Sequence, residues 1–227
     1  MKRAEAFVIA KTNGWLSGTS RNFQDEVLAS CDLLQFAPGT SIYNAGDEAG
    51  GLFCVVEGAV KLYLTWANGE HGLGHIAGPG FWAGDLAALT GRPRRISLTA
   101  KTHCNVLRIP RRDLLKIVEK QEGRWPHFVT LISSSLSLAL DIIDALKRDD
   151  MRKKVAACIM NLAEGATDGP KKIYVSQSEL GEISNLSRGQ IHKIIAEFER
   201  QGWLRRGYAT LEVTHMSALS NFLNSEP

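Results

Sequence analysis

Residues 175–204 carry the pattern of two short helices separated by a tight turn. Ser176 and Glu179 stand three residues apart as in a capping box, which predicts a helix start at Ser176. This helix should end near Asn185, which tolerates a turn, and Ser187 can cap the next helix. The second helix has one apolar face with the spacing i, i+3, i+4 and i+7, formed by Ile191, Ile194, Ile195 and Phe198. The segment therefore predicts a helix pair whose second member keeps its other face exposed.

That exposed face is small and basic. Its residues are Gly189, Lys193, Ala196 and Arg200, with Arg188 in the first turn. Residues 203–213 follow with two apolar runs around Arg205, Arg206 and Tyr208, which predicts a β-hairpin with a basic tip. A short helix with such a face fits the major groove of DNA, so the pattern favours a winged helix-turn-helix. A helix pair that serves only packing is the alternative.

The length of 227 residues suits two modest domains, each with its own core. The apolar share of 44% and the charged share of 22% are ordinary for a soluble globular protein. A formal charge of +3 does not by itself indicate a nucleic-acid partner, so only the positions of the charged residues can indicate one. The apolar run at residues 7–10 is too short for a secretion signal, and no stretch approaches the roughly 18 apolar residues of a membrane span. We expect a cytoplasmic protein that is not associated with a membrane.

The cysteines and histidines give no strong sign of a metal site. Cys31, Cys54, Cys104 and Cys158 lie far apart, and such residues in a reducing compartment are usually buried small hydrophobes. His71 and His75 flank glycines in an expected hairpin, where a surface-strand position competes with a metal or haem role. We expect no metal.

The first half of the chain has many short apolar runs separated by turn residues. Thr19 or Ser20 can cap an early helix, and Asn68-Gly69 is a strong hairpin signal. The runs that predict strands are residues 33–37, 42–43, 52–56, 59–66, 71–76, 96–100 and 105–109. Closely spaced short strands of this kind predict a β-sandwich or jelly roll.

A long helix should begin at Trp125-Pro126, because proline is favoured in a first helical turn. Its apolar residues Phe128, Ile132, Leu136, Ala139, Ile143 and Leu146 are spaced by three or four, and the last five form a heptad seam. Leu131, Leu138 and Ile142 lie beside the seam and could pack on the helix's own β domain. The seam favours a dimer of parallel helices, with a helix buried inside a monomer as the alternative.

This order of elements resembles the Crp/Fnr family of bacterial transcription regulators. Residues 57–62 (EGAVKL) are similar to the family's EGxVxL strand pair, and residues 187–188 to its SR helix start. Residues 80–86 (GFWAGDL) with residues 91–94 (GRPR) are similar to its phosphate-binding cassette. The resemblance implies an α+β protein of three parts. They are an N-terminal double-stranded β-helix (jelly-roll) sensor domain at residues 1–124, a dimerisation helix and hinge at 125–148, and a C-terminal winged helix-turn-helix at 149–227.

The resemblance also implies a homodimer that binds a palindromic double-stranded DNA operator and acts on RNA polymerase. Arg188 would read a guanine, while Ser176, Lys193, Arg205 and Arg206 would hold phosphates. The best-known members have a glutamate where this chain has Gly189, so Gln190 or His192 would supply the missing contact. The predicted DNA-binding residues are Ser176, Ser187, Arg188, Gly189, Gln190, His192, Lys193, Arg205 and Arg206.

In cyclic-nucleotide-binding relatives, a Gly-Glu pair and an Arg-Ser/Thr-Ala run hold the ribose and the cyclic phosphate. Here Gly84 and Asp85 stand at the first pair, and Arg94 stands at the arginine. Arg95 and Ile96 depart from the rest of the pattern. The candidate effector residues are Gly84, Asp85, Leu86, Arg94, Arg95, Ala139 and Leu140, the last two without the polar groups that would meet adenine. The pattern is compatible with cyclic AMP, with another anionic or apolar effector, and with no effector at all. The alternative for residues 92–95 is a solvated basic loop that binds nothing.

Other classes of function fit less well. The sequence has no GxSxG, GxGxxG, GxxxxGK[ST] or HExxH motif, so we expect no enzyme. A cyclic-nucleotide-responsive module that regulates a protein partner is the alternative to a DNA-binding regulator. Salt-dependent retention of DNA would distinguish the two, because phosphate contacts release counterions.

Overall fold

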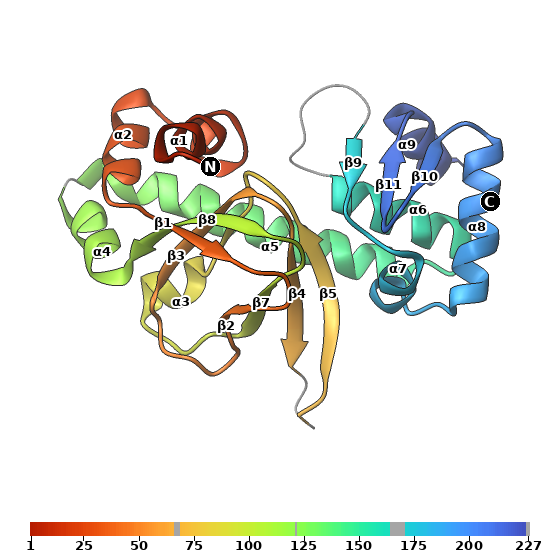
Figure 1. The fold of residues 1–227 in the computed structure, drawn as a ribbon, viewed down its shortest axis with the longest axis horizontal. Helices are drawn as coiled ribbons and strands as arrows, with labels where there is room; N and C mark the ends of the chain where they lie inside the picture. The colour runs from red at the N-terminus through yellow and green to blue at the C-terminus, as the bar shows by residue number, and fades with distance from the viewer. Residues whose placement is uncertain (66–68, 121, 164–170, 226–227) are drawn as a thin grey trace. The chain divides into compact units, whose positions relative to one another are not determined.

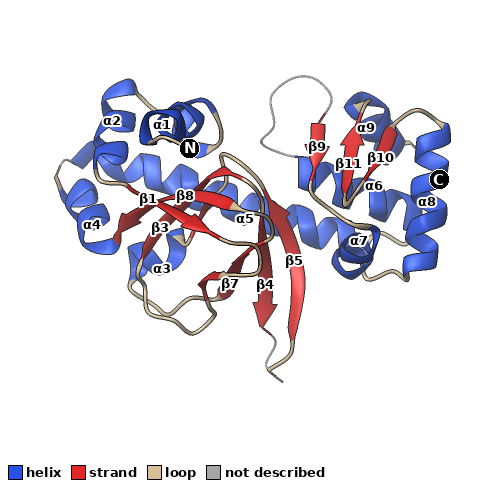
Figure 2. Cartoon of the chain, viewed as in Figure 1, coloured by secondary structure: helices blue, strands red, loops and turns tan. Residues whose placement is uncertain are grey.

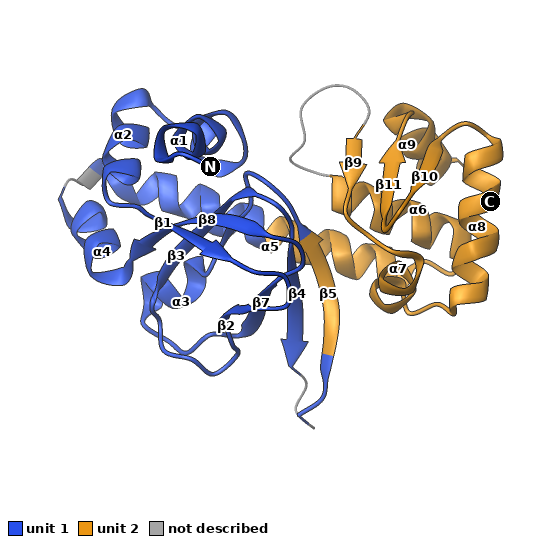
Figure 3. Ribbon diagram, viewed as in Figure 1, with its two compact units in different colours: residues 1–71, 77–135 blue, residues 72–76, 136–227 orange. Residues whose placement is uncertain are grey.

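The computed structural model describes residues 1–65, 69–120, 122–163 and 171–225. The predicted turn at Asn68 falls outside these residues. The chain divides into two compact units, one of residues 1–71 and 77–135 and the other of residues 72–76 and 136–227 (Figure 3). The division falls within the long helix α5, Trp125–Lys147.

The N-terminal half forms the predicted β-roll from two antiparallel four-stranded sheets (Figure 1). One sheet has the order β1-β8-β3-β6 and the other β2-β7-β4-β5. The strands are β1 (Asp32–Phe36), β2 (Ser41–Tyr43), β3 (Gly51–Glu57), β4 (Val60–Thr65), β5 (His71–Ala77), β6 (Trp82–Ala83), β7 (Ile96–Ala100) and β8 (Cys104–Pro110). Every predicted strand is confirmed to within a few residues, and β6 is an addition.

Short helices precede, interrupt and follow the strands of the roll. They are α1 (Arg3–Thr12), η1 (Trp15–Gly18), α2 (Arg21–Ala29), α3 (Asp85–Thr90), α4 (Arg111–Glu119) and η2 (Glu122–Arg124). Ser20 caps α2 through its side-chain oxygen, which confirms one of the two predicted caps. Helix α1 was not predicted, and it lies beside α2, where Lys11 pairs with Asp25 at 2.5 Å. Trp15 packs edge-on against Phe23 and Trp82 in the core beneath these helices.

Helix α5 has two different apolar faces. Phe128 and Leu131 are buried in the core of the roll, whereas Leu136 and Ile143 are 59% and 53% exposed. The prediction that Phe128 belongs to the dimer seam is therefore wrong, because this ring packs on Trp15 and Phe23. Val129, which is also exposed, has the heptad spacing that continues the seam of Ile132, Leu136, Ala139, Ile143 and Leu146.

Helix α5 is also long and apolar enough, by length and composition, to cross a membrane, and little of that window is buried. The prediction that no stretch of the sequence approaches a membrane span is therefore wrong for this helix. A single helix of this kind is weak evidence for a membrane span, since its apolar residues also match a helix–helix seam.

The C-terminal unit surrounds a three-stranded sheet of order β10-β11-β9 with helices (Figure 2). Its elements are α6 (Met151–Ala163), β9 (Lys171–Ile173), α7 (Gln177–Ser184), α8 (Arg188–Arg200), β10 (Leu204–Gly207), β11 (Thr210–Val213) and α9 (Met216–Asn224). Helix α9 was not predicted, and its Leu219 and Phe222 pack into the core of this unit.

The four cysteines are free and buried, as predicted. Burial raises the pKa of the Cys31 thiol to about 12 and that of Cys158 to about 11, so both behave as small apolar residues. Of the two histidines in the hairpin, His71 is exposed but His75 is buried, so the surface-strand position holds only for His71.

Candidate nucleic-acid interface

Two capping boxes and one left-handed residue build the helix pair α7–α8. The Ser176 side chain accepts a hydrogen bond from the Glu179 amide at 3.2 Å, and Ser187 accepts one from the Gln190 amide at 3.3 Å. Asn185, with φ of 54°, ends α7 in the left-handed conformation. Both predicted helix starts and the predicted turn are thus confirmed.

Helix α8 presents a basic face to solvent. Ile191, Ile195 and Phe198 are fully buried on the opposite face. Arg188, Gly189, His192 and Lys193 are exposed. Within the described part of the chain, the side chains of Arg188 and Lys193 form no hydrogen bond or ion pair, so both cations remain available to an anionic ligand. A Cβ added at Gly189 would meet no atom within 4 Å, which leaves open space beside Arg188.

Several other predicted DNA-binding side chains already have partners in the protein. The Ser176 hydroxyl donates to Glu179 at 2.8 Å, and His192 lies 3.3 Å from the Gln177 amide oxygen. Gln190 accepts from the Ser187 amide at 2.9 Å and donates to the Met151 sulfur at 3.0 Å. These side chains first stabilise the helix pair, and contact with DNA would compete with those bonds.

The hairpin predicted as a wing consists of β10 and β11, with a two-residue turn at Tyr208 and Ala209. Its tip is not basic as predicted, because both arginines lie within β10, and Tyr208 is fully exposed at the turn. Arg205 pairs with Glu212 across the hairpin at 3.3 Å, and Arg206 pairs with Glu199 of α8 at 2.5 Å. The pair with Arg206 holds the pKa of Glu199 below its ordinary value.

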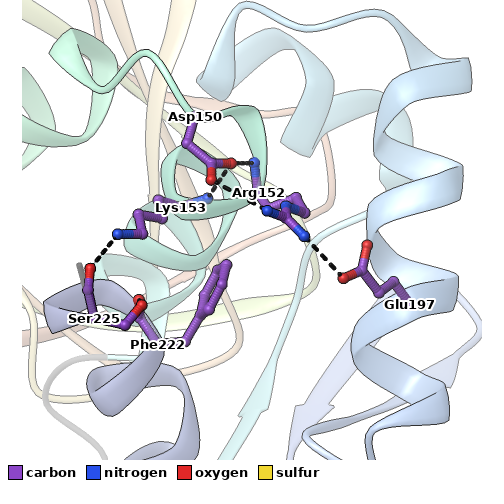
Figure 4. A network of polar contacts seen from close by, with 6 residues as sticks. All are labelled: Asp150, Arg152, Lys153, Glu197, Phe222 and Ser225. Atoms are coloured by element: carbon purple, nitrogen blue, oxygen red, sulfur yellow. Dashed lines mark hydrogen bonds and ion pairs between the residues drawn. The ribbon is translucent and has the colours of Figure 1, made fainter. Parts of the chain in front are cut away.

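The first turn of α6 contacts the C-terminal half of α8 (Figure 4). Asp150 accepts hydrogen bonds from the Arg152 and Lys153 amides at 2.8 and 3.3 Å. Burial opposes ionisation of Asp150, but these bonds and Arg152 outweigh it and lower its pKa. The Arg152 guanidinium reaches Glu197 at 3.5 Å and lies over the Phe222 ring. Arg152 therefore links the start of α6 to both α8 and α9.

Of the seven candidate effector residues, two are buried, Gly84 is half-buried, and four are exposed. Asp85 begins α3, and Gly84 precedes it as the helix N-cap in a left-handed conformation. Arg94 is 4% exposed and Asp85 is 8% exposed. Leu86 and Arg95 are exposed, and so are Ala139 and Leu140 on α5.

Among the described residues, no group of three or more His, Cys, Asp or Glu side chains is placed to hold a metal ion.

Two family models match the chain. The cyclic nucleotide-binding domain model matches residues 33–121, and the Crp-like helix-turn-helix domain model matches residues 153–222. The first match contains the strands of the roll from β2 onward, and the second contains α7, α8 and the wing.

Several known proteins are similar to most of the chain. The chain is 24% identical over 184 residues to the cyclic AMP receptor protein of Thermus thermophilus, which covers 81% of this chain and 84% of that protein. It is 24% identical over 205 residues to the HTH-type transcriptional regulator Cmr of Mycobacterium tuberculosis, covering 89% and 82%. The solved structure of FixK2 from Bradyrhizobium japonicum has the same fold, with a TM-score of 0.72 at 20% identity over 87% of this chain and 99% of that one.

Proposed function

Because the chain belongs to the Crp/Fnr family of DNA-binding transcription regulators, we propose that it binds a two-fold symmetric DNA site as a homodimer through its winged helix-turn-helix. The observation that carries this proposal is the first half of α8, where Arg188 and Lys193 are exposed and have no described partner. Arg188 is the proposed base reader, since its planar guanidinium can donate two hydrogen bonds to the edge of a guanine. Lys193 and Arg205 are proposed phosphate contacts, which position the unit without reading sequence. Arg206, which pairs with Glu199, would become a phosphate contact only when that pair opens.

We propose α5 as the dimerisation helix. Its exposed apolar residues follow a heptad spacing from Val129 through Leu136 to Ile143, which supports pairing with the same helix of a second copy. Pairing would cover the surface that otherwise resembles a membrane-spanning helix, so the proposed location is the cytoplasm. Two recognition helices in one dimer would reach half-sites about one helical turn apart. Contact with RNA polymerase from the operator-bound dimer is the proposed regulatory output.

The test is a selection of duplexes from a randomised DNA pool by the full-length protein, with and without cyclic AMP. We expect a palindrome whose half-sites are about 10 base pairs apart. Arg188→Ala, run in parallel, should recover no preferred sequence. Recovery of no palindrome in either arm would contradict DNA as the partner, and a single unpaired half-site would contradict the dimer.

A further inference from the structure

The roll buries two charged side chains in the region that matches the cyclic nucleotide-binding model. Among the described residues of that region they are Asp85 and Arg94. A cyclic phosphate is an anion and a ribose carries hydroxyls, so an arginine and a carboxylate are the groups that such a ligand would need. Whether these residues fit that ligand depends on the partners that they already have.

The Arg94 guanidinium is bonded to the protein itself. Its Nη2 donates to the Gly51 carbonyl at 2.6 Å, and its Nη1 donates to the Gly84 carbonyl at 3.1 Å. Its Cζ lies 4.3 Å from the centre of the Tyr43 ring and 5.4 Å from that of Phe53, within range of cation–π attraction. Arg94 therefore joins β2, the start of β3 and the N-terminus of α3.

The backbone around Arg94 fits the arginine closely. Gly84 has a φ of 89°, and a Cβ there would lie 2.1 Å from Arg94 Nη1. The Arg94 amide donates to the Asp47 carbonyl, and the Arg94 carbonyl accepts from the Gly46 amide, both at 2.9 Å. Glycine at position 84 is thus a steric requirement for the inward position of this guanidinium.

The Asp85 carboxylate is also occupied. It accepts a hydrogen bond from the Ser135 hydroxyl at 2.9 Å, together with bonds from the Leu86 amide and its own. Because Ser135 lies on α5, this bond joins α3 to the first part of the long helix.

The residues that precede the matched domain pack against the same region. A Cβ at Gly14 would lie 1.8 Å from the Gly80 carbonyl oxygen, so the two backbones are in direct contact just before β6. Trp15 Nε1 donates to the His127 carbonyl of α5 at 2.6 Å, and its ring packs on Trp82. The turn before α3 and the start of α5 are thus held together by the chain's own residues.

We propose that Arg94 is an internal strut rather than an anion ligand, and that the DNA binding of this regulator is independent of cyclic nucleotides. The second half of this statement rests on the proposed DNA-binding function. The Arg94 Nε is buried without a hydrogen-bond partner among the described residues, so the two Nη bonds hold the guanidinium in place. A cyclic phosphate that drew the guanidinium away from this position would leave the Gly51 and Gly84 carbonyls without these donors, which opposes binding. The Asp85 carboxylate would similarly have to give up Ser135.

The strut is tested by thermal unfolding of the full-length protein and of two variants. Arg94→Ala should lower Tm by about 5–10 °C, because it removes two charged hydrogen bonds from a buried site. Arg95→Ala removes the same charge from the neighbouring exposed residue and should change Tm by no more than about 1 °C. An unchanged Tm in Arg94→Ala would overturn the strut.

The ligand is tested on the parent protein, so the result does not depend on whether Arg94→Ala folds. Cyclic AMP and cyclic GMP at millimolar concentration should leave Tm unchanged and give no heat in titration calorimetry. A ligand present at about 100 times its Kd would instead raise Tm by about 5–10 °C. Such a rise, lost in Arg94→Lys, would overturn the proposal.

DNA affinity is then measured with and without each nucleotide. Equal affinity in both arms is expected, and binding that requires nucleotide would overturn the inference. Absence of DNA binding in both arms would refute the proposed function, while the unfolding and calorimetry results on Arg94 would still stand.

Discussion

Arg206 of the wing forms an ion pair with Glu199 near the end of α8, with 2.5 Å between Nη2 and Oε2. A second bond, from the Arg206 amide to Glu199 Oε1 at 3.1 Å, holds β10 against α8. The same pair neutralises an arginine that would otherwise contact a phosphate. Glu199 therefore both positions the wing and limits its charge.

Glu199→Gln should increase affinity for DNA of any sequence by several fold. The amide oxygen of glutamine can still accept from the Arg206 backbone, but the guanidinium becomes available to a phosphate. The slope of log affinity against log salt should steepen by about one unit. Fluorescence anisotropy at several salt concentrations measures both quantities. Weaker binding with an unchanged slope would show that Arg206 serves only to hold the wing.

Arg188→Ala and Lys193→Ala should have different consequences. Loss of Arg188 should abolish the preference for the selected palindrome while leaving weak, salt-sensitive binding, because each arginine–guanine contact provides about 1–3 kcal/mol of discrimination. Loss of Lys193 should weaken binding to specific and random duplexes alike and lower the salt slope by about one unit. Competition binding with both duplexes separates the effects. Retained specificity in Arg188→Ala would place base reading elsewhere on α8.

Gly189→Glu should stabilise the C-terminal unit and change its DNA preference. Glycine costs a helix about 1 kcal/mol relative to alanine, and an acidic side chain near a helix N-terminus is favourable. Open space at this position means that the new side chain meets no neighbour. Gly189→Ala is the control, since it should gain a similar stability without changing the selected sequence. An identical palindrome for parent and Gly189→Glu would exclude this position from base recognition.

The winged helix-turn-helix could be predicted because its signals are local. Capping residues, the turn at Asn185 and the isoleucine face all lie within one short stretch. Helix α1 escaped prediction because its buried residues are Ala6 and Ala10, which give no apolar periodicity. The pairing of Arg206 with Glu199 joins two elements whose contact no spacing rule predicts.

Contacts within the β-roll could not be predicted from the sequence either. Arg94 is bonded to backbone carbonyls, which every residue carries, so no sequence motif distinguishes a strut from an anion ligand. Phe128 has a spacing compatible with either face of α5. Its burial is decided by Trp15, more than 100 positions earlier in the chain.

Leu136→Glu combined with Ile143→Glu should convert the dimer into a monomer. Both side chains are more than half exposed in the single chain, so the substitutions should leave its own unfolding temperature nearly unchanged. In the paired helices they would place like charges in an apolar seam. Light scattering after size-exclusion chromatography measures the mass. Ser137→Glu, which changes an exposed α5 residue outside the heptad seam, is the control and should remain dimeric. A dimer that survives the double substitution would move the interface away from this face.

His75 should make the protein less stable in mild acid. Burial lowers the pKa of its ring from 6.5 to about 4. The unfolded chain takes up a proton below about pH 6.5, whereas the folded chain resists protonation until about pH 4. Stability linked to neutral His75 is therefore complete above pH 6.5 and falls by about 1.4 kcal/mol per pH unit between these values.

Urea unfolding of the parent and of His75→Gln from pH 7 to pH 4.5 isolates this contribution, because glutamine does not titrate in that range. The free energies of unfolding should converge as the pH falls, with the parent losing more. His103→Gln, at an exposed position, should follow the parent throughout. Parallel curves for parent and His75→Gln would mean that the ring is protonated equally well in the folded and unfolded chains.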